Sequence, residues 1–254
     1  MSITLAAIPN IPMIAPGDDL ARIIADAMIA FDFGLQPFDI LVVAQKIVSK
    51  SEGRAIRLSE VTPSPRALEL AKITQKGPRL VEVILSESVE VVRARPGVLI
   101  ARDRRGWVCA NAGVDRSNVD QDDPHGETVL RLPVDPDASA ARLREGLCER
   151  LGIDVGVIVA DSHGRPHRNG TIGVAIGAAG LPALEDLRGC HDLFGYTLQH
   201  TQVALADLIA SAATLLLGQA AEGTPAVIVR GVPHTQRDGS AQELVRPIEM
   251  DLFP

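Results

Sequence analysis

The sequence predicts an α+β fold of mixed sheets and helices, because its strand signals come partly in consecutive runs and partly alternate with helices. Residues 89–110 hold three successive strand patterns separated by Pro-Gly and Arg-Gly turns. The short apolar runs 39–44 and 154–160 are typical of buried strands that stand between helices. This pattern does not favour a doubly wound parallel sheet. Because no repeat or clear linker divides the chain, we expect one domain over residues 1–254, or two intimately joined subdomains.

Capping residues mark the starts of several expected helices. Asp19 precedes an apolar pattern of helical spacing, and Ser64 precedes Pro65, which suits the first position of a helix. Asp137 and Ser139 are expected to cap a later helix. In chain order, the expected helices begin at Leu20, cover 65–74, 78–88 and about 139–151, and span roughly 201–217. The expected strands are 3–8, 39–44, 89–93, 98–102, 107–110, 128–133, 154–160, 171–178 and 225–230, with a polar–apolar alternation at 45–50 and a polar loop at 120–127.

Composition limits the classes of function. The chain is 46 % apolar and 22 % charged, which is ordinary for a globular protein. A net charge of −7 and an aromatic content of 3 % argue against nucleic-acid binding, which needs basic surfaces or stacking platforms. Three scattered cysteines are expected to be buried, reduced thiols. No signal peptide or membrane span is expected, so the predicted location is the cytoplasm.

The octet 111–118 (NAGVDRSN) carries the most chemistry in the shortest length. It places two carboxamides, a carboxylate, a guanidinium and a hydroxyl directly after the apolar run 107–110. Such oxygen-rich groups suit Mg²⁺ or Mn²⁺ carrying phosphate groups. The same residue types also build ordinary turns, so the octet alone is compatible with both interpretations.

A second cluster, 161–170 (DSHGRPHRNG), repeats this pattern after the apolar run 155–160. An aspartate at the end of a buried strand, here Asp161, is a fixed oxygen ligand for a divalent ion. Arg165 and Arg168 suit bidentate contacts to phosphate oxygens. Together, Asp115 and Asp161 indicate a site where metal ions bridge the phosphates of a nucleotide, the alternative being that each merely caps a turn.

Other motifs are weaker. His163 and His167 would suggest zinc if they lay on one helix, but Pro166 makes a helix there improbable, which favours loop histidines near a polar site. Lys46 and Lys50 are either phosphate-binding cations or solvated lysines. The loop 218–225 is able to wrap a ligand or simply ends the preceding helix. Neither a P-loop nor a Rossmann fingerprint is present.

Six segments closely resemble one known family, the coenzyme F420-0:L-glutamate ligases, which are the gamma-glutamyl ligases of the deazaflavin coenzyme F420. They are VVAQKIVSKSEGR (42–54), RARPGVLIARDRRGWVCANAGVDRSNV (93–119), LPVDPDASAARLR (132–144), VGVIVADSHGRPHRNGTIGVAIG (155–177), DLFGYTL (192–198) and GTPAVIVRG (223–231). The resemblance runs from about Ile8 to Phe253. We expect the form without the nitroreductase-like domain that some actinobacterial relatives carry.

The resemblance implies a fold, an activity and partners. The fold is an α+β arrangement that forms an intertwined homodimer, with the nucleotide site near the interface. GTP phosphorylates the terminal carboxylate of coenzyme F420-0, and the amine of L-glutamate attacks the acyl phosphate; further glutamates are added through gamma linkages. The implied cofactor is a divalent metal, Mg²⁺ or Mn²⁺, as two ions, with K⁺ as a further candidate. No general base is identified.

Site roles carry over from the family position by position. Metal ligands are expected at Asp115, Asp161, Ser162 and Gln219, where Ser162 replaces the usual Thr and Gln219 replaces a residue that is often acidic. Nucleotide contacts are expected at Ile11, Pro12, Met13, Ile14, Gln45, Lys46, Lys50, Asn118, Gly218, Gln219, Ala220, Ala221, Glu222, Gly223, Thr224 and Pro225.

Two departures from the family keep alternatives open. Gln219 puts one metal contact in doubt, and His163 and His167 stand where relatives have other residue types, which bears on acceptance of the deazaflavin end of the substrate. The alternatives are a nucleotide-binding homologue that has lost catalysis and an amide ligase that acts on a different acceptor acid.

Overall fold

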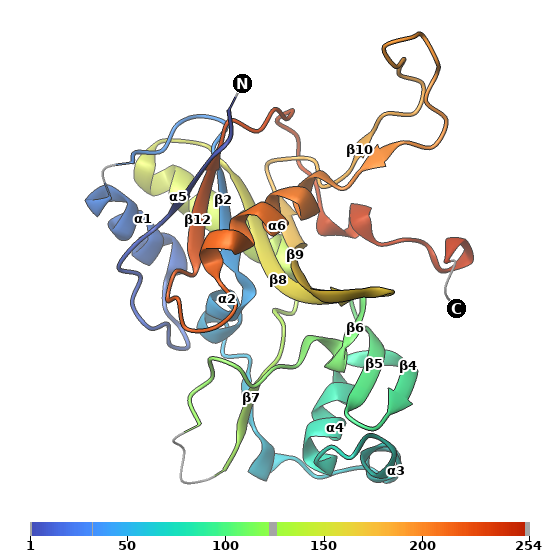
Figure 1. The fold of residues 1–254 in the computed structure, drawn as a ribbon. Helices are drawn as coiled ribbons and strands as arrows, with labels where there is room; N and C mark the ends of the chain where they lie inside the picture. The colour runs from blue at the N-terminus through green and yellow to red at the C-terminus, as the bar shows by residue number, and fades with distance from the viewer. Residues whose placement is uncertain (1, 32, 122–125, 252–254) are drawn as a thin grey trace.

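The computed structural model describes residues 2–31, 33–121 and 126–251, so part of the expected loop 120–127 lies outside the described residues. The larger region is built on a five-stranded sheet with the order β1-β12-β2-β8-β9 (Figure 1). Its strands are β1 (Thr4–Ala7), β12 (Ala226–Arg230), β2 (Ile40–Ala44), β8 (Gly156–Arg165) and β9 (Arg168–Ala179). Only β2 and β8 run parallel; the other neighbours are antiparallel. The mixed α+β class is therefore confirmed.

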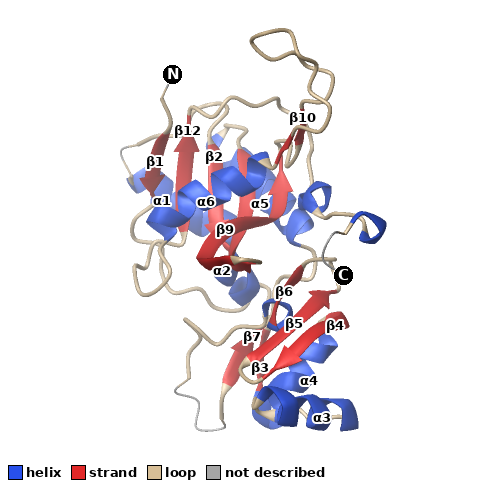
Figure 2. Cartoon of the chain, turned by 45° about the vertical axis from the view of Figure 1, so that its right-hand side comes forward, coloured by secondary structure: helices blue, strands red, loops and turns tan. Residues whose placement is uncertain are grey.

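Helices cover both faces of this sheet, which explains the continuous apolar runs of its central strands. Helices α1 (Leu20–Ala30) and α5 (Pro136–Leu151) lie on one face, and α6 (Leu205–Leu217) lies on the other (Figures 1 and 2). Because successive strand residues point to opposite faces, Leu41 and Val43 pack with α1 and α5, whereas Ile40 and Val42 pack with α6.

A smaller region, residues 55–130, packs around its own hydrophobic cluster. Helices α3 (Pro65–Thr74) and α4 (Pro78–Ser86) cover the three-stranded sheet β4 (Ser88–Arg95), β5 (Val98–Asp103) and β6 (Val108–Ala110) (Figure 2). The chain enters and leaves it through the paired strands β3 (Ala55–Arg57) and β7 (Thr128–Leu130), with the short helix η1 (Leu58–Glu60) next to β3. The three consecutive strands expected at 89–110 are confirmed.

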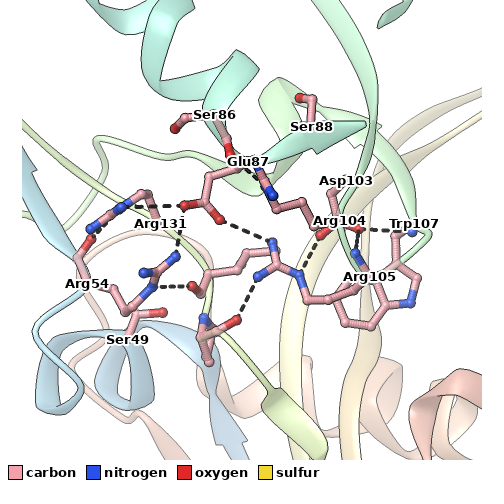
Figure 3. Close-up of polar contacts among 12 residues, drawn as sticks. Ser49, Arg54, Ser86, Glu87, Ser88, Asp103, Arg104, Arg105, Trp107 and Arg131 are labelled. Atoms are coloured by element: carbon pink, nitrogen blue, oxygen red, sulfur yellow. Dashed lines mark hydrogen bonds and ion pairs between the residues drawn. The ribbon is translucent and has the colours of Figure 1, made fainter. Parts of the chain in front are cut away.

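A buried ion network holds the two regions together (Figure 3). Glu87, at the end of α4, accepts a hydrogen bond of 2.9 Å from Arg54 and lies 3.5 Å from Arg131 and 3.7 Å from Arg105. Arg54 also donates to the carbonyl of Leu132 at 2.8 Å. Arg54 precedes β3 and Arg131 follows β7, so they flank the two points at which the chain passes between the regions. The single carboxylate of Glu87 therefore joins the small region to both connecting segments.

Four local expectations were wrong. Residues 45–50 are not an extended alternation but helix α2 (Gln45–Ser51). Strand β8 does not end at Ala160, because its pairing with β9 continues to Arg165. Helix α5 is capped by Asp135, which accepts a hydrogen bond of 2.9 Å from the Ala138 amide, and not by Asp137 or Ser139. Helix α6 starts at Leu205, after β11 (Gln202–Val203), and not at 201.

A two-stranded arm projects from the larger region (Figure 1). Strands β10 (Glu185–Asp186) and β11 pair at its base, and the loop between them exposes Leu193, Phe194 and Tyr196. The short helices η3 (Ala241–Leu244) and η4 (Ile248–Met250) follow β12. Within the described residues, no helix is both long and apolar enough to cross a membrane.

Candidate functional site

A cavity of about 630 Å³ opens where the larger and smaller regions meet. Its lining residues come from 11–14, 44–47, 117–120, 160–162 and the end of α6, and they include Lys50 and all of 217–225. The structure therefore brings together every position at which a nucleotide contact was expected. Of the expected metal ligands, Asp161, Ser162 and Gln219 line the cavity, and Asp115 contacts two lining side chains, Lys46 and Ser117.

The parallel pair β2 and β8 fixes one wall of the cavity. Ala44 of β2 and Ala160 of β8 are register partners. The residues that follow them, Gln45, Lys46 and Asp161, therefore lie at the same edge of the sheet. Beyond this point the two segments differ: β2 is followed by helix α2, whereas β8 continues as a strand. Within α2, Lys46 and Lys50 stand one helical turn apart and both line the cavity.

The lysines give the cavity a local positive charge in a chain that is acidic on average. Burial lowers the pKa of Lys50, the neighbouring charge of Lys46 lowers it further, and the carboxylate of Asp120 opposes this shift. Lys46 is held by an ion pair with Asp115 and by a hydrogen bond of 2.9 Å to the Ser117 hydroxyl. An anion in the cavity would therefore raise the pKa of Lys50 and compete with Asp115 for Lys46.

Asp115 is held by its own turn as well as by Lys46. Its carboxylate accepts hydrogen bonds of 2.7 Å from the Arg116 amide and 3.0 Å from the Ser117 amide, and 2.6 Å from the Ser117 hydroxyl. Burial acts to raise the pKa of Asp115, but the hydrogen bonds from Lys46 and Ser117 outweigh it and hold the pKa below its usual value. Asp115 is thus an anion whose position is fixed.

The backbone before Asp115 is strained. Asn111, Ala112 and Gly113, which form the short helix η2 (Asn111–Gly113), have φ values of 54°, 51° and 74°. A left-handed conformation is unfavourable for Ala112, and a β-carbon on Gly113 would lie 2.4 Å from the Leu132 side chain. Such strain persists only where packing over-determines the conformation, and it concentrates at functional sites.

Asp161 lies in the interior of β8, not at a strand end. Its carboxylate contacts the His163 ring at 3.1 Å, and both side chains are nearly buried. Residues two apart in a strand point to the same face, so Asp161 and His163 are neighbours by geometry. Ser162 points to the opposite face and is exposed, although it also borders the cavity.

All residues of the loop 218–225 line the cavity. Glu222 folds back and accepts a hydrogen bond of 2.8 Å from the Ala220 amide, which a side chain at Gly218 would obstruct. Asn118 reaches across from the small region and donates to the Ala220 carbonyl at 2.9 Å. The loop therefore contacts both regions.

Two residues predicted near the phosphates, Arg165 and Arg168, lie elsewhere. Together with His167 they form the turn between β8 and β9, and none of the three is among the described residues that line the cavity. The described residues contain no group of three or more His, Cys, Asp or Glu side chains that could hold a metal, which gives no support to a zinc site.

Ser117 lines the cavity, and sequence reasoning left it without a role. Its hydroxyl bridges Lys46 and Asp115. The available signal was its place two residues after Asp115, where a side chain commonly joins an Asx-type turn.

Of the cysteines, only Cys109 is buried, and burial raises its pKa to about 12; Cys190 is exposed, contrary to expectation.

Comparison with known proteins decides the family. The sequence model of the F420-0:Gamma-glutamyl ligase family matches residues 9–231. The chain belongs to this family. It is 46 % identical over 255 residues to the protein named coenzyme F420:L-glutamate ligase of Methanothermobacter thermautotrophicus, covering 100 % of this chain and 99 % of the relative. The proteins of the same name from Methanopyrus kandleri and Archaeoglobus fulgidus are 48 % and 40 % identical over 256 and 253 residues, covering 99 % and 100 % of this chain and 98 % and 97 % of the relatives. The predicted family resemblance is confirmed.

Proposed function

We propose that the protein is a GTP-dependent ligase that joins L-glutamate to coenzyme F420-0 and extends the product with gamma-linked glutamates. One observation carries the proposal. Lys46, Lys50, Asp115 and Asp161 gather at a cavity of about 630 Å³, in a chain that matches a protein named coenzyme F420:L-glutamate ligase along its whole length. A cavity of this size accommodates a nucleotide.

The chemistry requires activation of a carboxylate. A carboxylate is a poor electrophile, so its oxygen first attacks the γ-phosphorus of GTP, releasing GDP and forming an acyl phosphate. The glutamate amine then attacks the acyl carbon, an amide bond forms, phosphate leaves and the amine loses a proton. Lys46 and Lys50 are placed to neutralise phosphate charge, while Asn118 and the loop 218–225 position the nucleotide.

The residues at the cavity fit a divalent metal of the Mg²⁺ or Mn²⁺ type. The candidate donors are oxygens: the Asp161 carboxylate, the Ser162 hydroxyl and the Gln219 amide line the cavity, and the Asp115 carboxylate contacts the lining residues Lys46 and Ser117. Such ions commonly bind nucleotides through one or two carboxylates together with water and phosphate, so a cluster of three acidic side chains is not needed. A cation already accompanies Asp115 in the form of the Lys46 ammonium. When bound, the metal would supply charge neutralisation on the phosphates. We propose a second divalent ion and K⁺ as further cofactors of the same reaction.

The projecting arm supports the proposal of a homodimer. Leu193 and Phe194 are 98 % and 96 % exposed at its tip, which is costly for large apolar side chains in water. An arm with a short paired base and an apolar tip suits packing against a second copy of the chain, as in an intertwined dimer. Replacing both residues by Ser should shift the protein from dimer to monomer in sedimentation experiments. A wild-type monomer would contradict this part of the proposal.

The activity is tested by mass spectrometry of the reaction with F420-0, L-glutamate, GTP and Mn²⁺. The proposal predicts products heavier by one or more glutamyl units and an equal number of GDP molecules. With ¹⁸O in the acceptor carboxylate, one label should appear in the released phosphate, as the acyl phosphate requires. Turnover of a different acid from an acceptor panel would indicate another amide ligase. GTP binding without any product would indicate a homologue that has lost catalysis.

A further inference from the structure

A second cavity of about 320 Å³ lies next to the first and is separated from it by the Asp161–His163 pair. Asp161 lines the first cavity, and His163 lines the second. Val174, the register partner of Asp161 on β9, also lines the second cavity. The two cavities therefore meet at the Asp161–His163 contact of β8.

The charged groups of the second cavity are suited to a small zwitterion. Two guanidinium groups, Arg102 and Arg246, and two carboxylates, Asp207 and Asp251, line it, and Asp251 lies 3.8 Å from Arg102. An amino acid with an acidic side chain carries two carboxylates and one ammonium, so it can pair with both arginines and with the carboxylate of Asp207. Arginine recognises carboxylates bidentately.

The two arginines have capacity for a ligand. Arg102 is largely buried, yet its nearest carboxylates, Glu90 and Asp251, lie 3.5 and 3.8 Å away, longer than the 2.7–2.9 Å of a strong charge-assisted hydrogen bond. Among residues 2–31, 33–121 and 126–251, none forms a hydrogen bond or ion pair with the exposed Arg246.

The carboxylate of Asp207, like the two arginines, has capacity for a ligand. One of its oxygens accepts a hydrogen bond of 2.8 Å from the Ala175 amide. Burial nevertheless raises the pKa of Asp207, against the effects of that hydrogen bond and of His163. An ammonium group beside the carboxylate would stabilise its ionised form.

We propose that this second cavity binds the amino-acid substrate, with Arg102 and Arg246 on its carboxylates and Asp207 on its ammonium group. The inference rests on the proposed ligase function and places the amino acid in the cavity that His163 lines, next to Asp161 of the nucleotide cavity. It also explains selection of an acidic amino acid, because two arginines favour two carboxylates.

The test compares Arg246→Ala and Asp207→Asn with wild type in steady-state kinetics and in direct binding of isotope-labelled L-glutamate followed by NMR. Each variant should raise the KM for L-glutamate about tenfold or more, with the KM for GTP unchanged. Asp207→Asn keeps an oxygen for the Ala175 amide, so folding should be preserved. Arg95→Ala, which removes an exposed arginine of β4, is the charge-matched control and should change neither constant.

The outcomes separate this inference from the proposed function. A wild type that ligates while both variants retain the wild-type KM for L-glutamate overturns the assignment of the cavity only. Variants that raise the KM for GTP equally also overturn it. A wild type that binds L-glutamate, loses this binding in both variants and yet never ligates would contradict the ligase function while supporting the cavity assignment.

Discussion

The two aspartates at the first cavity are held in opposite ways. Asp161 lies within a ten-residue strand of the large sheet, and its side chain is 14 % exposed. Asp115 belongs to the small region, follows a strained turn, and its side chain is 43 % exposed. Its backbone pairs with Leu130, also of the small region, through hydrogen bonds of 3.0 and 2.8 Å. One carboxylate is fixed by the sheet, while the other is positioned by how the small region docks. The geometry of the site therefore depends on the contact between regions.

Removing the Glu87 charge should break this contact and have the largest effect. In Glu87→Gln, three nearby arginines lose their shared buried counter-charge, so the free energy of unfolding should fall by about 3 kcal/mol. Denaturant titration gives this value. The control Glu69→Gln removes an exposed ion pair on α3 and should cost less than about 1 kcal/mol. Equal losses in the two variants would mean that the network does not join the regions.

The carboxylates themselves are tested by Asp161→Asn and Asp115→Asn. Each should reduce kcat of the ligation about 10²-fold, because each variant removes a charge that the reaction centre uses. Stability should change little, since asparagine keeps a hydrogen-bonding oxygen. Asp26→Asn, on the exposed face of α1, should leave kcat unchanged. If only one of the two variants loses activity, the site belongs to one region alone.

Sequence patterns predicted those strands and helices whose signal lies within the element itself, such as an apolar run or a capping residue. The apolar runs of β2 and β8 and the Ser64-Pro65 start of α3 are examples. The seven residues of α2 are too few to separate a helical period from an alternating one. Strand β8 was predicted too short because its apolar character stops at Ala160, whereas its pairing with β9 does not.

The site was predicted in composition but not in geometry. The positions that line the cavity came from the family resemblance, since no local pattern links Lys46 to Asp115, 69 residues apart. The Asp161–His163 contact follows from strand periodicity, which was obscured by the assumption that the strand had ended. Arg165 and Arg168 were predicted beside the phosphates for the same reason, and the longer strand carries them away from the cavity.

A smaller effect concerns the pH dependence of GTP binding. Because its pKa is lowered, Lys50 loses its proton at a pH below the usual lysine pKa of 10.5. The affinity for GTP should therefore be highest at pH values below this lowered pKa, and it should fall as the pH rises through it. Calorimetry should show that Lys50→Arg, which stays charged, delays the fall, and that Lys72→Arg on α3 does not. Identical pH profiles for wild type and Lys50→Arg would show that Lys50 does not contact the phosphates.

The smallest effect is expected at Arg116, next to Asp115. Its ion pair with Glu127 is exposed, so Arg116→Gln should change the free energy of unfolding by less than about 1 kcal/mol. Ligation should also be unaffected, because Asp115 uses the backbone amide of residue 116 and not its side chain. A large loss of activity would assign Arg116 a place in the site.

The central claim is that carboxylates from two regions act on one nucleotide–metal complex. A double-mutant cycle of Asp115→Asn and Asp161→Asn, with Mn²⁺–GTP affinity measured by calorimetry, tests it directly. We expect coupling of at least about 0.5 kcal/mol, with the double variant losing less affinity than the two single losses combined. Fully additive losses would contradict it.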